Sequence, residues 1–183
     1  MKTVVRASGM VLALCTILVL SAGAVCDAAA GGRLFELGLG GGINLNGVNS
    51  TQFLISPAVF IPLAGSRVFR LGVEGDIEFI EHEGRVTVIT GIAPLIRAIA
   101  PSGTVRPFIE IGGGVNYASR KRIDGKELDG PFLFSAMAGA GIEMTAGKRL
   151  LRASYRLRHL SNGSLYDKNE GLNTQYLFLS ISF

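Results

Sequence analysis

The sequence predicts an all-β protein, an eight-stranded antiparallel transmembrane β-barrel. After residue 30, apolar and polar residues alternate with a period of two in most segments, as in strands whose side chains point to opposite faces. These segments are about 9–13 residues long, which is the length of a tilted membrane-spanning strand. The mean hydropathy of +0.40 is high, yet the chain has only one long hydrophobic run, close to its N-terminus.

That run gives residues 1–30 the pattern of a cleaved secretory signal peptide. A positively charged start and an apolar core of about 10 residues precede three alanines at 28–30, which offer a small-residue cleavage site. A lipoprotein anchored at Cys26 is the alternative, although Val25 stands where such a signal has a small residue. We therefore expect a signal peptide over 1–30 and an outer-membrane barrel domain over 31–183.

The cysteines and the charge exclude several classes of function. Cys15 and Cys26 both lie in the predicted signal, so the mature chain has no thiol for a disulfide or a cysteine-based metal site. The sequence pI is near 9.3, but the basic residues form neither a dense run nor a patch interleaved with aromatic residues. We expect no nucleic-acid partner.

Clusters of Gly, Pro, Asn and Asp separate eight predicted strands. The strands are expected near residues 34–45, 52–62, 69–80, 86–96, 108–117, 132–144, 151–158 and 177–183. The second and fourth are apolar on both faces and contain Pro57 and Pro94. Because proline removes a hydrogen-bond donor from the ladder, an edge or a bulge is expected at each.

In the other strands one series is apolar and the second carries charges and glycines. A small closed barrel turns its apolar series toward lipid and fills its lumen with the second series. The inward charges are expected to pair, because an unpaired buried charge is costly, and the inward glycines to make room for arginines. The predicted inward charges are Glu36, Arg70, Glu74, Asp76, Glu78, Glu110, Glu143, Arg152, Arg156 and Arg158.

The alternative is a soluble, lipocalin-like barrel in which the two faces are exchanged. Three features favour the membrane: the signal peptide, the glycines of the charged series and the closing segment 176–183. That segment ends on Phe183 and resembles the assembly signal of bacterial outer-membrane barrels. With both termini in the periplasm, the seventh strand runs outward and ends at the outer leaflet, where lipopolysaccharide lies.

The end of the seventh strand carries a histidine and a serine that project to the same side. His159 and Ser161 belong to the apolar series, and the imidazole is near enough to accept the serine proton. Asn162 and Gly163 follow and can donate amide hydrogens to an oxyanion. Asn173 has the outward parity of the last strand, so its side-chain oxygen can accept the other imidazole N–H.

The only other histidine of the predicted mature chain is His82, in a loop between Glu81 and Glu83. A histidine flanked by carboxylates can bind a metal, but a single histidine in a loop is more often solvated. We expect no metal site there.

Two stretches of the second half resemble the outer-membrane lipid A 3-O-deacylase (PagL) family. Residues 156–163, Arg-Leu-Arg-His-Leu-Ser-Asn-Gly, are followed by Asn-Glu-Gly-Leu-Asn at 169–173, and together they look like the end of that family. Residues 106–115 resemble its fifth strand. The resemblance covers roughly residues 105–183, with His-x-Ser-Asn as its most specific motif, and the first half matches only in barrel pattern.

The resemblance implies an eight-stranded barrel that hydrolyses the ester at the 3-position of lipid A, without a metal or an organic cofactor. It makes Ser161 the nucleophile and His159 the general base. Asn162 would contribute to the oxyanion hole, with Gly163 and Asn169 as further candidates.

The sequence departs from the family at the third member of the triad. The best-known members carry glutamate there, and the ungapped position here is Asn173. Asparagine can orient a histidine but adds no negative charge to stabilise the imidazolium. Glu170 is the alternative third member, although its parity is wrong for a strand position. The sequence does not decide whether Asn173 or Glu170 orients His159.

The leading hypothesis is an outer-membrane serine esterase that removes a 3-O-linked acyl chain from lipid A, with lipopolysaccharide as substrate. A non-enzymatic structural or adhesive barrel is the first alternative. An acyltransferase barrel is the second alternative. Such a barrel usually needs a wide apolar lumen, and the predicted inward charges disfavour one. The acyl-chain preference, the regulation and the oligomeric state, with a homodimer among the options, stay open.

Overall fold

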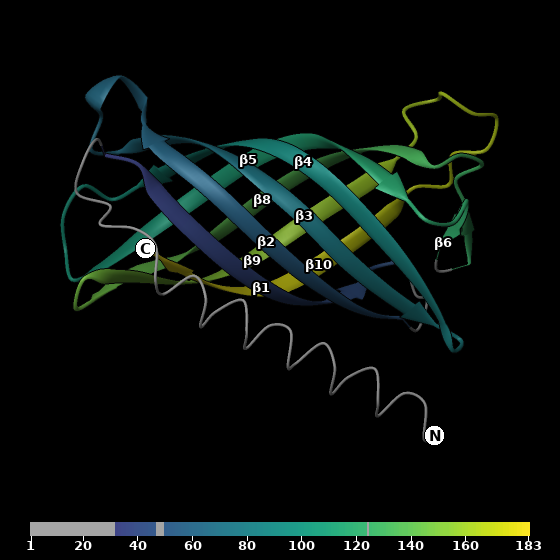
Figure 1. The fold of residues 1–183 in the computed structure, drawn as a ribbon, viewed down its shortest axis with the longest axis horizontal. Helices are drawn as coiled ribbons and strands as arrows, with labels where there is room; N and C mark the ends of the chain where they lie inside the picture. Colours follow the sequence, from purple (N-terminus) through teal and green to yellow (C-terminus); the bar gives the residue numbers. More distant parts are fainter. Residues whose placement is uncertain (1–31, 47–49, 124) are drawn as a thin grey trace.

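The computed structural model describes residues 32–46, 50–123 and 125–183, and in this part of the chain eight long antiparallel strands form a closed barrel (Figure 1). The strand order is β1-β10-β9-β8-β5-β4-β3-β2. The long strands are β1 (Leu34–Asn44), β2 (Thr51–Pro62), β3 (Phe69–His82), β4 (Arg85–Ile99), β5 (Val105–Ala118), β8 (Phe132–Ala146), β9 (Arg149–Ser161) and β10 (Leu172–Ser182). The predicted fold class is confirmed.

Two small elements complete the described part of the chain. A 3-10 turn, η1 (Leu63–Gly65), follows β2, and a two-stranded hairpin of β6 (Arg122–Ile123) and β7 (Lys126–Glu127) lies between β5 and β8. None of the helices in the described residues is long and apolar enough to cross a membrane. The predicted signal peptide lies outside the described residues.

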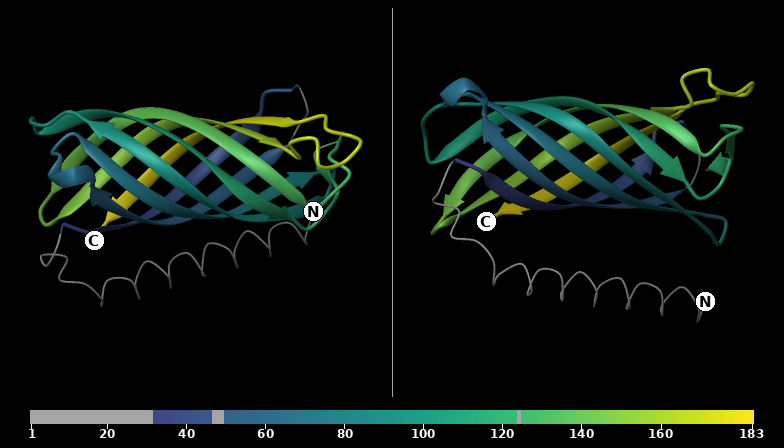
Figure 2. Two further views of the ribbon diagram at one scale, coloured as in Figure 1. Left: turned by 90° about the horizontal axis from the view of Figure 1, so that it is seen from above. Right: turned by 45° about the horizontal axis from the view of Figure 1, so that its top comes forward.

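The two ends of the barrel differ in the length of their connections. The C-terminus and the short turn at 147–148 lie at one end, while the hairpin β6–β7 and the long loop 162–171 lie at the other (Figures 1 and 2). Outer-membrane barrels carry short periplasmic turns and longer extracellular loops. We therefore assign the end with the long loops to the cell surface.

The outward faces of the strands are apolar, as the alternation predicts. On β10, Leu177 and Leu179 are 73% and 65% exposed, whereas their neighbours Phe178 and Ser180 are buried. The same alternation runs along β1, β3, β5, β8 and β9. A band of exposed apolar side chains around a closed barrel is the surface that lipid requires.

The lumen holds a paired network of six acidic and six arginine side chains. Its members are Glu36, Glu74, Asp76, Glu78, Glu110, Glu143, Arg70, Arg97, Arg106, Arg152, Arg156 and Arg158. Arg97 and Arg106 were absent from the predicted set. Arg97 lies one residue beyond the predicted end of its strand, which in fact continues to Ile99. It binds Glu36 at 2.8 Å and Glu110 at 2.9 Å.

The inward glycines make room mainly for aromatic rings, and Gly139 makes room for an arginine as expected, because a Cβ atom there would lie 3.0 Å from Arg156 Cγ. A Cβ atom at Gly38 or Gly40 would collide with the ring of Phe178, and one at Gly72 with the ring of Phe60. The arginines then stack on these rings: the Arg97 guanidinium lies 4.1 Å from the Phe60 ring centre. The glycines therefore set the depth of the rings, and the rings support the network.

The expectation of an edge or a bulge at the two prolines was wrong. Pro57 lies within β2 and Pro94 within β4, and both point outward. Pairing lapses beside Pro57 on the β3 side and beside Pro94 on the β5 side, but the register resumes with no extra residue. Each proline therefore costs local hydrogen bonds without shifting the alternation of faces.

An apolar cluster closes the cell-surface end of the lumen. Ile123 and Leu128, in and after the β6–β7 hairpin, are fully buried and pack with Leu160 of β9 and Leu172 of β10. The sequence did not predict this hairpin, because the loop at 119–131 is polar and has no long alternating segment. Its two apolar residues anchor the inner side of the β9–β10 hairpin.

Candidate active site

The candidate site lies on the outward face of β9 and β10, at their cell-surface ends. His159 pairs directly with Asn173 across the two strands, and with Ala136 of β8 on the other side. Ser161 is two residues further along β9, opposite Phe134. The predicted parity of His159, Ser161 and Asn173 is therefore present in the structure.

The side chains of His159 and Asn173 are in hydrogen-bond contact. The His159 Nδ1 atom lies 2.7 Å from the Asn173 Oδ1 atom. Because an amide oxygen only accepts, Nδ1 is the donor in this hydrogen bond, and in the neutral imidazole the lone pair then lies on Nε2. The Asn173 backbone N–H donates to Asn46 Oδ1 at 3.0 Å and so fixes the start of β10. This geometry leaves His159 able to accept a proton.

Ser161 is half-buried beside this pair, on the same outward face. Among the described residues its hydroxyl takes part in no hydrogen bond, including none with His159. Hydrogen bonds between catalytic groups are often long before substrate binds and shorten in the complex. The hydroxyl is therefore free to turn toward His159 Nε2 or toward a substrate.

Asn162 is completely buried and holds the loop after β9 in place. Its Nδ2 group donates to the carbonyl oxygens of Leu128 at 2.9 Å and Lys168 at 2.7 Å, and its Oδ1 accepts the Ser164 N–H at 2.8 Å. Its backbone N–H donates to Asn169 Oδ1 at 2.9 Å. The hydrogen-bonding groups of the Asn162 side chain are thus engaged within the protein.

Gly163 follows with a backbone that favours glycine. Its φ is +60°, and a Cβ atom there would lie 2.7 Å from the Phe134 ring. The loop therefore passes close over an aromatic side chain of β8, immediately beside Ser161. A larger residue at this position would strain the backbone and displace the loop.

The Glu170 carboxylate faces the β6–β7 hairpin instead of His159. It accepts the backbone N–H of Glu127, and the Glu170 N–H donates to Glu127 O at 3.3 Å. Lys168 forms an ion pair with the Glu127 carboxylate. The hydrogen bond and charge of Lys168 lower the pKa of Glu127, and those of Glu127 raise the pKa of Lys168. These contacts fasten the loop 162–171 to the hairpin.

Gly171 is a site residue that the sequence did not reveal. Its φ is +64°, and a Cβ atom there would lie 3.1 Å from the His159 Cε1 atom. The glycine thus lies directly against the imidazole edge that carries Nε2. A glycine before a strand is usually interpreted as a turn residue, so this contact could not be predicted from the sequence.

Gly171→Ala is expected to lower kcat about 100-fold, since a displacement of about 1 Å in a catalytic group can cost that much. Gly147→Ala is the matched control. Gly147 has a similar φ of +61°, but a Cβ atom there meets nothing within 4 Å. Both variants should lose similar stability, and only Gly171→Ala should lose catalytic turnover. Equal kcat values in the two would show that Gly171 does not position His159.

No metal site accompanies this arrangement in the residues that the structure describes, where no three His, Cys, Asp or Glu side chains gather closely enough. His82 Nε2 lies 4.0 Å from Glu83 Oε1.

Comparisons with known proteins show the family to which the chain belongs. The family model described as lipid A 3-O-deacylase (PagL) matches residues 63–182. The chain belongs to the lipid A 3-O-deacylase (PagL) family. The match includes the whole of β3 to β10, with the His159–Ser161 segment and the loop that follows it.

A curated relative resembles the chain in sequence, and two solved structures resemble it in fold. The lipid A deacylase PagL of Pseudomonas aeruginosa is 32% identical over 78 residues, which is 43% of this chain and 43% of that protein. The crystal structure of the outer-membrane enzyme PagL has a TM-score of 0.65 and 22% identity, covering 79% of this chain and 97% of that one. Neisserial surface protein A has a TM-score of 0.58 and 13% identity, covering 82% and 94%.

The two structural likenesses establish the barrel fold. Family membership makes the chain one of a family of deacylases, and this membership together with the barrel assigns it to the outer membrane. Neisserial surface protein A shares the barrel although its sequence is only 13% identical. The barrel by itself is therefore not diagnostic of catalysis, because the activity depends on the residues of the site.

Proposed function

We propose that the chain is a serine esterase that hydrolyses the 3-O-linked acyl ester of lipid A in the outer leaflet. One observation carries the proposal: the imidazole of His159, oriented by Asn173 at 2.7 Å, lies outward beside Ser161 in a member of a deacylase family. A histidine on a lipid-facing surface is energetically costly, so its presence there favours a functional role. The outward direction lets an acyl chain reach the site from within the leaflet.

The reaction proceeds in two transfers of the acyl group. Ser161 Oγ attacks the ester carbonyl while its proton passes to His159 Nε2. The tetrahedral intermediate collapses, the bond to the sugar oxygen breaks, and His159 returns the proton to that oxygen. A water molecule then attacks the acyl-enzyme with His159 as base, which releases the fatty acid and restores Ser161.

We assign the oxyanion hole to the loop after Ser161. The backbone N–H of Gly163 and the Nδ2 group of Asn169 are the proposed donors, because Asn169 Oδ1 is already engaged by the Asn162 N–H. Asn162 fixes both donors through its own buried hydrogen bonds. Removing one such donor from a serine hydrolase costs about 10²–10³ in kcat.

Mass spectrometry of lipid A from cells with and without the protein tests the proposal. Loss of one 3-hydroxyacyl chain supports the esterase. A gain in mass would indicate an acyltransferase, and an unchanged profile a structural or adhesive barrel. Either of the last two outcomes would end the proposal.

Asn173 is the proposed third member of the triad, and its replacement has opposite expected effects in two variants. Asn173→Leu should lower kcat about 10²–10⁴-fold, because the imidazole loses its orienting acceptor. Asn173→Glu should raise kcat by at most about 10⁴-fold. This upper limit is the factor by which the reverse change, from acid to amide, lowers kcat in a serine protease. The measurement is kcat on purified lipid A. Full activity in Asn173→Leu would show that Asn173 is not the third member of the triad and would favour Glu170.

A further inference from the structure

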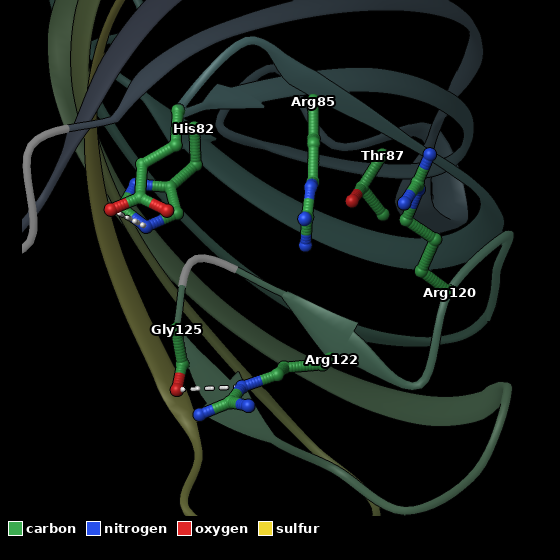
Figure 3. A pocket seen from close by; sticks show the side chains of 7 residues that line it. His82, Arg85, Thr87, Arg120, Arg122 and Gly125 are labelled. Carbon is green, nitrogen blue, oxygen red and sulfur yellow. Dashed lines mark hydrogen bonds and ion pairs between the residues drawn. The ribbon is translucent and has the colours of Figure 1, made fainter.

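A cavity of about 440 Å³ opens at the cell-surface end of the barrel, apart from the catalytic pair. It lies between the β3–β4 turn, which contributes His82 and Arg85, and the segment after β5, which contributes Arg120 and Arg122. In Figure 3, Arg85 extends from β4 into the space that Arg122 borders from the other side. Thr87, a buried residue of β4, also lines the cavity.

The strand order separates this cavity from Ser161. β5 and β8 stand between β4 and β9 on one side of the barrel, and β3, β2, β1 and β10 on the other. A molecule held by Arg85 is therefore not the ester group that meets Ser161. The cavity is a second site, and the proposed esterase does not need it for its chemistry.

The arginines of this cavity differ from those of the lumen. Each of the six luminal arginines is paired with a carboxylate at 3.1 Å or less. In the described residues, by contrast, no hydrogen bond or ion pair engages the guanidinium groups of Arg85 and Arg120. Among the described residues, Arg122 donates to the Gly125 carbonyl oxygen, at 3.4 Å, and its charge also acts on the Glu127 carboxylate.

The lining of the cavity is therefore rich in guanidinium N–H donors that have no partner among the described residues. Among the described residues that line the cavity, three arginines stand against one carboxylate, that of Glu83, which lies 4.0 Å from His82 Nε2. Like charges that converge on one cavity in excess over opposite charges repel each other, and a bound anion relieves that repulsion. The planar guanidinium fork matches the oxygens of a phosphate group in a bidentate way.

We propose that this cavity binds a phosphate monoester carried by a sugar at the membrane surface, namely the phosphorylated head of a second lipopolysaccharide molecule. A volume of about 440 Å³ suits a phosphorylated sugar. At the outer end of the barrel, the rim is level with the head groups of the outer leaflet. Arg85 and Arg120 supply the unengaged donors, and Arg122 and the Thr87 hydroxyl complete the cradle.

The test measures binding to purified protein in detergent micelles that carries Ser161→Ala, so that no ester is consumed. The probes are inorganic phosphate, glucosamine 1-phosphate, glucosamine, and lipopolysaccharide with or without its phosphates. The double variant Arg85→Gln/Arg120→Gln is compared with Arg67→Gln, which removes an exposed arginine at the opposite end of the barrel. A gel shift between heated and unheated samples confirms that each variant is folded.

The double variant should bind glucosamine 1-phosphate and phosphorylated lipopolysaccharide at least tenfold more weakly, and Arg67→Gln should be unchanged. Glucosamine and dephosphorylated lipopolysaccharide should not distinguish the variants. Equal Kd values for the phosphorylated probes in both variants would overturn the proposal. Binding of inorganic phosphate without glucosamine 1-phosphate would overturn the lipid as the source. Because these readouts involve no hydrolysis, failure of the esterase proposal would leave them unaffected.

Discussion

Ser161→Ala is expected to leave lipid A fully acylated in cells in which the wild-type chain removes one acyl group. The hydroxyl is the only group that the proposed mechanism can acylate, so its loss removes covalent catalysis and leaves only the oxyanion donors. In a serine protease the comparable change lowers kcat about 10⁶-fold. The measurement is the release of 3-hydroxy fatty acid from purified lipid A, together with the lipid A mass profile.

The barrel should survive this change, because the Ser161 hydroxyl makes no hydrogen bond among the described residues. Ser164→Ala is the matched control: it removes a hydroxyl from the same loop, three residues away, on an exposed side chain. It should retain wild-type turnover. Release of fatty acid by Ser161→Ala at the rate of Ser164→Ala would exclude a serine nucleophile at this site.

The fold could be predicted because a transmembrane strand offers only two environments. Lipid accepts only the apolar series, so the alternation shows both where the strands lie and which of their side chains point outward. The outward parity of His159 and Asn173 followed from the same rule. Their direct pairing across β9 and β10 then depends only on the hairpin register, which a local sequence largely determines.

Contacts between distant segments could not be predicted in this way. Glu170 has the charge of a triad residue, but its partner is a backbone amide of β7, in a hairpin of two-residue strands. Asn162 was expected to face an oxyanion, while its side chain is fastened to Leu128, 34 residues earlier. Such partners depend on how one loop folds over another, which leaves no periodic signal in the sequence.

The largest effect on stability is expected at Arg156, in the middle of the luminal network. Its guanidinium binds Glu74 at 2.9 and 3.0 Å and Glu110 at 2.6 Å, and lies 3.7 Å from the Phe178 ring centre. Glu110 keeps a second partner, Arg97, at 2.9 Å. Glu74 has no other ion pair among the described residues, so removal of Arg156 leaves its buried carboxylate uncompensated.

Arg156→Met should therefore lower the free energy of unfolding by about 3–5 kcal/mol, the usual result of removing one partner from a buried ion pair. Adding Glu74→Gln should restore part of this loss, because the uncompensated charge disappears. Arg149→Met is the control. This arginine is exposed at the periplasmic end of β9, 4.8 Å from the Phe183 ring centre. Its loss should lower the free energy of unfolding by about 1 kcal/mol or less. Denaturant midpoints of the refolded proteins in detergent measure all three. If Arg156→Met unfolds at the same midpoint as Arg149→Met, water reaches Glu74 and the network contributes little to stability.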